Sequence, residues 1–184
     1  MIFTETPLKG AYVIDPEPAH DARGCFARTW CQWEFGARGL DARPVQCSVQ
    51  FSERRGTLRG IHYQEAPFEE VKLVRCTAGA IFDVIVDLRP GSPTFAHHFH
   101  TVLSAANRRM VYVPRGFAHG SQTLEDGTEV EYQISEAYQP AHARGVRWND
   151  PALGICWPLV ACRVIGERDR SYPDLLCVSR EMAG

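Results

Sequence analysis

The sequence lacks paired cysteines. It contains seven cysteines, and no two of them have Cys-x-x-Cys spacing. This argues against a disulfide framework and against a zinc knuckle. Several have apolar neighbours, which predicts small buried side chains in a reducing cytosol. A nucleophilic cysteine is the alternative, although none lies in an activating motif. The seven are Cys25, Cys31, Cys47, Cys76, Cys156, Cys162 and Cys177.

The sequence also has no excess of positive charge and no long apolar run. Its formal net charge is −2 and its pI is near 6.4, whereas nucleic-acid binding usually needs a strongly basic face. An anionic ligand would therefore need a local cluster of arginine and lysine. No apolar window reaches transmembrane length, and residues 1–7 lack the basic n-region of a signal peptide. We expect a cytoplasmic protein that binds neither nucleic acid nor membrane.

Length and composition predict one globular domain. The chain has 184 residues, of which 45% are hydrophobic and 23% are charged, and this is enough for a sizeable core. We expect the domain to span residues 1–184, with an N-terminal arm at about 1–45 and a C-terminal tail at about 150–184.

Helical periodicity is missing from residue 45 onward. Short β-branched runs separated by Gly or Pro predict an antiparallel all-β sandwich or barrel. A strand at 7–14 and a short helix at 31–39 are expected upstream. The turn at 77–80 predicts a tight hairpin, and 89–93 is a strong turn cluster. The other predicted strands lie at 45–51, 58–64, 70–78, 80–87, 97–103, 109–113, 120–123, 130–135 and 146–148.

The stretch at 56–64 is the first candidate for chemistry. In an extended strand, Leu58, Gly60, His62 and Gln64 share one face because side chains alternate. A histidine beside glutamine and glycine suits the floor of a pocket, and the glycine would let a ligand approach the backbone. The alternative is a structural histidine whose hydrogen bonds are satisfied.

A second motif has Pro-x-Gly-x-x-His spacing over residues 114–119 and ends in His119. This is the second motif of cupins, whose double-stranded jelly rolls hold a ligand cavity. Metal-binding cupins also need His-x-His in an earlier motif, where this chain has His-Tyr-Gln at 62–64. His98 and His100 have that spacing without a following glutamate, and we assign them to a surface strand. The pattern predicts a cupin that performs acid–base chemistry without a metal.

Beyond these motifs, the chain resembles the dTDP-4-dehydrorhamnose 3,5-epimerase family of nucleotide-sugar epimerases. The similar blocks follow the family's order along nearly the whole chain, so the resemblance is specific. They are D-x-R-G at 21–24, L-R-G-I-H-Y-Q at 58–64, K-L-V-R at 72–75, F-D-V-I-V-D-L-R-P-G-S-P-T-F at 82–95, L-S-A-x-N-R-R at 103–109, V-P-R-G-F-A-H-G at 113–120, E-Y-Q at 131–133 and R-G-V-R-W-N-D-P at 144–151.

The resemblance implies epimerisation at C3, C5 or both carbons of a nucleotide-diphospho-4-keto-6-deoxysugar, without cofactor or metal. It implies His62 as catalytic base, Asp169 as its orienting carboxylate, Lys72 as enolate stabiliser and Tyr132 as opposing acid. It also implies a homodimer in which N-terminal segments cross between subunits. The residues that it places around the nucleotide-sugar are Arg23, Phe26, Gln46, Arg59, His119 and Tyr138.

These residue types suit the implied chemistry. A proton next to the ketone leaves to give an enolate, and a neutral imidazole with an ordinary pKa of about 6.5 can take it. Asp169 can accept Nδ1–H of His62 and fix its tautomer. Lys72 would stabilise the enolate oxygen, and Tyr132 would protonate from the other face. The structural alternatives are a packed tyrosine, a solvated lysine, surface arginines at 23 and 59, and a solvated charge run at 167–174.

The chain departs from the family at several positions, and other functions stay open. Family members often have an acidic residue at the position of Arg28, an Asn-containing stretch at 48–51, a Glu at Arg115 and an aromatic residue at Ser121. The first three change charge or polarity near the expected pocket and leave the exact substrate undecided. The rival functions are a non-catalytic nucleotide-sugar-binding cupin and a metal-dependent cupin oxygenase.

Overall fold

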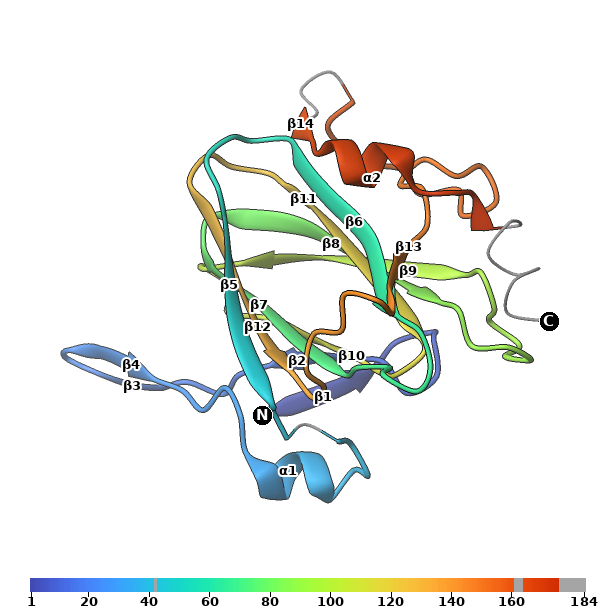
Figure 1. Ribbon diagram of the computed structural model, residues 1–184. Coiled ribbons are helices and arrows are strands. Elements are labelled where there is room, and N and C mark those ends of the chain that lie inside the picture. The colour runs from blue at the N-terminus through green and yellow to red at the C-terminus, as the bar shows by residue number, and fades with distance from the viewer. Residues whose placement is uncertain (42, 161–163, 176–184) are drawn as a thin grey trace.

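Two antiparallel sheets face each other across an apolar interior in the computed structural model, which describes residues 1–41, 43–160 and 164–175 (Figure 1). The predicted burial of the cysteines is wrong for most of those described, because Cys76 is buried and Cys31 half-buried but Cys25, Cys47 and Cys156 are exposed. Cys162 and Cys177 lie outside the described residues. The first sheet has the spatial order β1 (Ile2–Glu5), β2 (Tyr12–Asp15), β10 (Met110–Val113), β7 (Lys72–Ala78), β12 (Thr128–Ile134) and β5 (Gln46–Ser52).

The second sheet carries the remaining long strands. Its order is β13 (Ala143–Gly145), β6 (Thr57–Gln64), β11 (Phe117–Thr123), β8 (Ala80–Asp87) and β9 (His98–Ser104). The short β14 (Val164–Ile165) pairs in parallel with β6, and β3 (Ala19–Asp21) forms a separate hairpin with β4 (Gly24–Phe26). The helices are α1 (Gln32–Gly36) and α2 (Glu167–Ser171). This arrangement confirms the predicted all-β jelly roll.

The alternation of apolar side chains explains how the layers pack. The inner faces contribute Val74 and Val130 from the first sheet and Ile81, Ile85 and Phe117 from the second to one buried cluster. Burial of this kind is the main favourable contribution to folding, at roughly 25 cal/mol per Å² of apolar surface. The two sheets are therefore held together by this buried interior.

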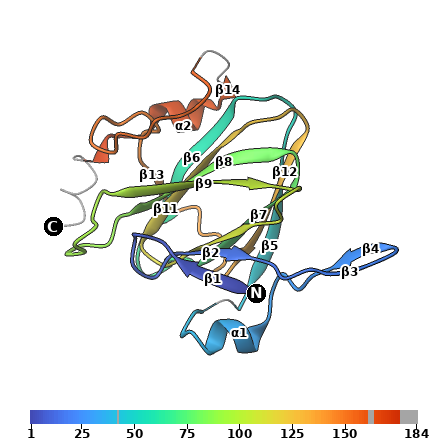
Figure 2. The same ribbon diagram turned by 180° about the vertical axis from the view of Figure 1, so that it is seen from behind.

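The outer faces of both sheets are covered by segments from the two ends of the chain. Phe35 of α1 packs with Leu73 and Tyr112 on the first sheet. Trp157 and Leu175 pack on the second sheet. Figure 2 shows α2 beside β6 and the β3–β4 hairpin extending away from both sheets. No helix in the described ranges is long and apolar enough to cross a membrane.

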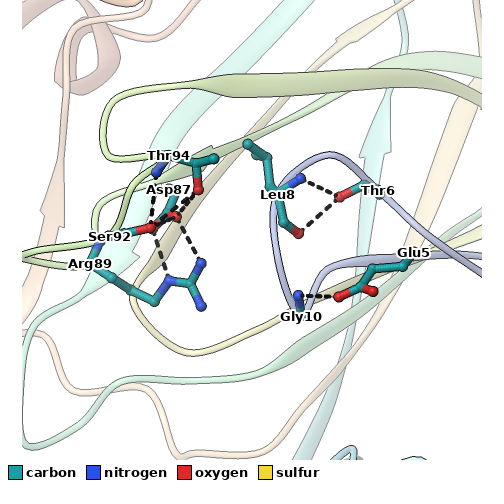
Figure 3. A network of polar contacts seen from close by, with 8 residues as sticks. All are labelled: Glu5, Thr6, Leu8, Gly10, Asp87, Arg89, Ser92 and Thr94. Atoms are coloured by element: carbon teal, nitrogen blue, oxygen red, sulfur yellow. Dashed lines mark hydrogen bonds and ion pairs between the residues drawn. The ribbon is translucent and has the colours of Figure 1, made fainter.

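The strand predicted at 7–14 is wrong in its first half. Residues 7–10 form the turn between β1 and β2, and the strand predicted there begins only at Tyr12. The hydroxyl of Thr6 accepts a hydrogen bond from the Leu8 amide at 3.1 Å, and the Glu5 carboxylate accepts one from the Gly10 amide at 3.0 Å (Figure 3). These local bonds compete with strand pairing, and Gly10 has a φ of 88° that a turn requires.

The tight hairpin predicted at 77–80 is also wrong. β7 and β8 do not pair with each other, because β7 lies in the first sheet and β8 in the second. The turn at Gly79 instead takes the chain from one sheet to the other. A Cβ at Gly79 would lie 2.4 Å from Oγ1 of Thr128, so glycine is required there by a close neighbour as well as by its φ of 70°.

The strand predicted at 146–148 lies three residues earlier, at β13. Val146 still exchanges backbone hydrogen bonds with Ile61, at 2.9 and 3.2 Å. β13 therefore adds an edge to the second sheet directly beside the stretch at 56–64.

The simple alternation expected at 56–64 is wrong, because β6 contains a bulge. His62 pairs with His119 and Arg59 pairs with Ser121, so two residues of β6 lie opposite the single residue Gly120. Ile61 consequently packs on the outer face together with Leu58, and Arg59 lines the same cavity as His62. A Cβ on Gly60 would lie 2.5 Å from Cα of Gly120. The glycine at position 60 therefore allows β6 and β11 to lie close together, and it does not serve the approach of a ligand.

Candidate active site

A cavity of about 640 Å³ opens where β5, β6 and β7 meet α2. Its size is in the range that small-molecule ligands occupy. Six of the ten predicted site residues line it, although they come from positions more than a hundred residues apart. They are Gln46, Arg59, His62, Lys72, Tyr138 and Asp169.

His62 and Asp169 form a hydrogen-bonded pair at the wall of this cavity. Nε2 of His62 lies 2.7 Å from Oδ1 of Asp169, and Oδ2 of Asp169 accepts a hydrogen bond from the Gly60 amide at 3.1 Å. The His62 side chain is 42% exposed and that of Asp169 is 11% exposed. The imidazole is thus open to a ligand, and its carboxylate partner is shielded.

The electrostatics of Asp169 favour its charged form. Burial works to raise the pKa of this carboxyl group, but the hydrogen bond from His62, the nearby charge and the Gly60 amide outweigh burial. Its pKa therefore lies below its ordinary value. Asp169 stays ionised and can hold an adjacent imidazolium.

The predicted geometry of this pair is wrong in one respect. Asp169, which lies in the helix α2, reaches the far ring nitrogen Nε2 of His62 instead of Nδ1. α2 lies beyond the side chain of His62, so the tip of the ring meets the carboxylate. Nδ1 makes no hydrogen bond within the described part of the chain. The nitrogen available as a base is therefore Nδ1.

Lys72 lies across the cavity on the first sheet and is held by a carboxylate that is not among the predicted site residues. Its Nζ lies 2.5 Å from Oε1 of Glu70, and the two side chains are only 12% and 8% exposed. Both residues line the cavity. The signal was present in the sequence, because residues 70 and 72 share a face of an extended segment.

Tyr132 and His119 are not among the residues that line the cavity. Their rings pack edge to face at 5.8 Å, and the Tyr132 hydroxyl lies 3.2 Å from Oε1 of Gln50, a lining residue. Burial raises the pKa of Tyr132, so its phenol keeps its proton at neutral pH. Nε2 of His119 lies 2.6 Å from Oδ1 of the buried Asp83. The role of Tyr132 as an acid stays a prediction.

At the rim of the cavity, polar contacts position residues expected around the nucleotide. The Tyr138 amide donates to Oε1 of Gln46 at 3.0 Å, and the Tyr138 ring is exposed. The guanidinium of Arg168 lies 3.4 Å from the Tyr138 hydroxyl. Arg59 donates to the carbonyl oxygen of Phe51 at 3.2 Å. The ring of Tyr138 and the guanidinium groups of Arg59 and Arg168 are therefore among the groups that border this cavity.

Arg23 and Phe26 are not brought to the cavity of their own chain. Both belong to the projecting β3–β4 hairpin (Figure 1). Arg23 pairs with Asp21 at 2.6 Å, and its side chain is 89% exposed. Phe26 is 81% exposed. Their expected contact with a ligand stays a prediction that needs a second chain.

Three of the departures, Arg28, Arg115 and Ser121, lie away from this cavity, whereas the stretch at 48–51 includes Gln50, which lines it. Arg28 pairs with Glu34 at 2.9 Å, and Arg115 lies 3.4 Å from Asp41. Neither arginine lines the cavity of its own chain. Ser121 is buried on β11. The changes of charge at Arg28 and Arg115 are therefore balanced locally.

The histidines of the two motifs lie side by side, and each already has a carboxylate partner. His62 and His119 are partners in the register of β6 and β11. Their Nε2 atoms lie against Asp169 and Asp83. Among the residues that the structure describes, no group of three or more His, Cys, Asp or Glu side chains is arranged to hold a metal ion.

Comparison of the chain with known proteins identifies one family that it resembles along most of its length. The model of a family described as dTDP-4-dehydrorhamnose 3,5-epimerase matches residues 5–176. A protein of that name from Methanothermobacter thermautotrophicus is 44% identical over 94% of this chain and 94% of its own length. One from Sinorhizobium fredii is 41% identical over 95% of this chain and 90% of its own.

Solved structures agree with this result. The Bacillus anthracis dTDP-4-dehydrorhamnose 3,5-epimerase with TDP and PPi bound has a TM-score of 0.91 and 40% identity, covering 95% of this chain and 99% of that one. A 3′-monoepimerase from Streptomyces bikiniensis in complex with dTDP-quinovose has a TM-score of 0.89 and 34% identity, covering 96% and 89%.

Proposed function

The chain belongs to the dTDP-4-dehydrorhamnose 3,5-epimerase family, whose members are isomerases, and on this premise we propose how its own residues act. It epimerises a dTDP-4-keto-6-deoxysugar at the carbons next to the ketone. The observation that carries the proposal is the pair His62 and Asp169, which opens on a cavity that Lys72 faces from the opposite sheet.

His62 removes the proton. The carbons next to a ketone are acidic because the resulting anion is delocalised onto the ketone oxygen. Asp169 accepts Nε2–H of His62, which leaves the lone pair on Nδ1, and the carboxylate then stabilises the imidazolium that forms. The imidazole has 42% of its side chain exposed, so a bound sugar can reach it. The imidazolium of His62 then carries the proton that has left the sugar.

Lys72 stabilises the enolate oxygen. Its ammonium group is a compact charge in a site with little water, and a positioned donor of this kind contributes about 3 kcal/mol to the transition state. Glu70 orients the ammonium group at 2.5 Å. Because the two side chains are almost fully buried, their geometry is maintained before substrate arrives.

Tyr132 returns a proton to the opposite face of the sugar. It comes from β12 of the first sheet, and His62 comes from β6 of the second. Burial keeps its phenol protonated, which a general acid requires. Inversion of a carbon needs such a pair, because the proton must leave on one side and return on the other.

The nucleotide is held at the rim by Arg59, Gln46 and Tyr138, whereas His119, also expected around the nucleotide-sugar, is buried against Asp83 and does not line the cavity. The guanidinium fork of Arg59 suits a diphosphate, and the exposed ring of Tyr138 offers a stacking surface. TDP is bound in the Bacillus anthracis structure, and this supports the choice of nucleotide.

A homodimer completes the site, with Arg23 and Phe26 supplied by the hairpin of a second chain. Two features support this proposal. The hairpin projects with an exposed aromatic ring and an exposed guanidinium, and alternate residues of β5, namely Cys47, Val49 and Phe51, are exposed along one edge of the first sheet. Exposed apolar patches of this kind are typical of protein interfaces.

The seven cysteines without paired spacing keep the cytosol as the expected compartment.

Solvent exchange tests the proposed reaction. The wild-type protein is incubated with dTDP-4-keto-6-deoxyglucose in D₂O, and deuterium at each sugar carbon is measured by NMR and mass spectrometry. Incorporation at C3 and C5 is expected for a 3,5-epimerase. Incorporation at C3 alone would place the chain with the 3′-monoepimerase that it resembles. Absence of exchange at both carbons would contradict the proposal.

A further inference from the structure

The catalytic histidine has a second neighbour that the reaction described above does not use. Tyr172 follows α2 directly, and its ring meets the imidazole of His62 edge to face, with centroids 5.7 Å apart and planes at 65°. Asp169, on the same helix, holds the tip of the imidazole at 2.7 Å. One short segment therefore contacts His62 twice, through a carboxylate and through an aromatic ring.

Gly145 shows that the place of this ring is built into the fold. Gly145 is the register partner of His62 across β13 and β6. A Cβ at position 145 would lie 2.5, 2.6 and 2.7 Å from Cε2, Cζ and Cδ2 of Tyr172. The backbone of Gly145 has no left-handed φ, so its conformation does not call for glycine. The Tyr172 ring is what requires glycine at this position, because the ring lies directly over the Cα atom of Gly145.

The segment that carries Tyr172 is fixed on its far side. The carbonyl oxygen of Pro173 accepts a hydrogen bond from the Arg147 amide at 2.9 Å, and Arg147 pairs with Asp174 at 2.8 Å. The amide of Leu175 donates to the Asp150 carboxylate at 2.5 Å. On the near side, the guanidinium of Arg168 lies 5.7 Å from the centre of the Tyr172 ring. The ring is thus held by the chain on both sides of it.

We propose that Tyr172 is a positioning residue, whose ring keeps the His62 imidazole in the orientation that bonds Asp169 and shields that side of it from water. The proposal rests on the assigned role of His62 as the base. An imidazole held by one hydrogen bond can still swing about its side-chain torsions, whereas a second rigid contact fixes it. Catalytic geometry must be held within about half an ångström, and a displacement of about 1 Å can cost about 100-fold in rate.

An NMR measurement on the full chain without substrate tests the positioning directly. In ¹⁵N-histidine-labelled protein, His62 is expected to show one tautomer, with the proton on Nε2. Tyr172→Ala should shift its two nitrogen signals toward the average of both tautomers. Tyr172→Phe, which keeps the ring, should retain the wild-type signals. An unchanged His62 spectrum in Tyr172→Ala would overturn the proposal, even if the protein proved to have another activity.

Kinetics give the second readout. Tyr172→Ala should lower kcat by about 10- to 100-fold with a much smaller change in KM, since a misplaced base slows the chemistry. Tyr172→Phe should restore most of kcat, because the contact is made by the ring. If Tyr172→Phe were as impaired as Tyr172→Ala, the hydroxyl would be the working group, and the positioning role would be wrong.

A double-mutant cycle with Gly145 adds a test of the contact itself. Gly145→Ala should displace the ring and lower kcat to a similar extent as Tyr172→Ala. Combined with Tyr172→Ala, it should cost little more, because coupled residues are not additive. Gly36→Ala, at a glycine with open space around it, is the control and should leave kcat unchanged. Additive losses would refute the coupling. Should Gly145→Ala not fold alone, the double variant, which removes the clash, still decides the question.

Discussion

At His62, the bulge in β6 decides which way the imidazole points. Without the additional residue opposite Gly120, His62 would lie on the same face as Leu58, which packs on the outer cluster. The bulge instead turns His62 and Arg59 to the cavity together. The sequence motif identifies the histidine, but strict alternation assigns the wrong neighbours to it. A bulge depends on how two strands pair, which a single stretch of sequence does not show.

The residue that separates proton removal from inversion is Tyr132. In Tyr132→Phe, His62 can still remove and return a proton on its own face, so substrate exchange with D₂O should persist. Net inversion should fall by about 100-fold or more, because the acid on the other face is missing. Comparison of deuterium content with the yield of epimer measures both quantities in one sample.

Gln133→Glu serves as the control, because Gln133 is the next residue on β12 and faces away from Tyr132. It should change neither quantity by more than about twofold. Equal loss of exchange and inversion in Tyr132→Phe would contradict the division of roles between Tyr132 and His62.

At the scale of the elements, the connection from β8 to β9 depends on one buried carboxylate. Asp87 is fully buried and accepts hydrogen bonds from Nη2 of Arg89 at 2.7 Å, from Oγ of Ser92 at 2.6 Å and from Oγ1 of Thr94 at 2.7 Å (Figure 3). Burial works to raise the pKa of Asp87, but these donors outweigh it and hold the pKa well below the ordinary value.

Asp87→Asn should therefore destabilise the protein at pH 7, by about 2–4 kcal/mol in the free energy of unfolding. Because the pKa of Asp87 is lower in the folded state than in the unfolded state, its charge stabilises the fold fully at pH values above the unfolded pKa of about 3.9. This stabilisation is lost as the pH falls through the folded pKa. The difference between wild type and variant should thus shrink between about pH 5 and pH 3. Urea unfolding followed by tryptophan fluorescence measures it.

Asp126→Asn, at an exposed turn, is the control for the loss of a carboxylate, and its effect should be smaller at pH 7. A difference for Asp87→Asn that stayed constant from pH 7 to pH 3 would show that the buried charge does not stabilise the connection.

The elements themselves were predictable where local pattern and tertiary pairing agree. The strands around His62, Lys72 and Tyr132 lie close to their predicted places because β-branched runs and Gly or Pro turns mark them. The turn at 77–80 predicts a hairpin that does not form, because a turn sequence does not tell whether the next strand stays in the same sheet. The sequence does not predict α2, because a five-residue helix with charged side chains has no apolar periodicity. Asp169 is predicted only by the family resemblance.

At the scale of the whole molecule, the site is expected to need two chains. Arg23→Ala and His62→Ala are each expected to be inactive or nearly so. After subunit exchange, about half of the dimers are mixed, and one of the two sites in each contains both His62 and Arg23. Activity should therefore return to about a quarter of the wild-type value, measured per chain at equal concentration. If the mixture stayed as inactive as its parents despite proven exchange, the hairpin would act within its own chain.

The account as a whole depends on His62 as the base that removes the sugar protons, and deuterium exchange in His62→Ala measures this most directly. Exchange at both C3 and C5 is expected to fall by about 10²- to 10⁴-fold, because no proton leaves without the base. His97→Ala, at an exposed histidine outside the cavity, should exchange at the wild-type rate. Exchange in His62→Ala at a rate close to wild type would contradict the central claim.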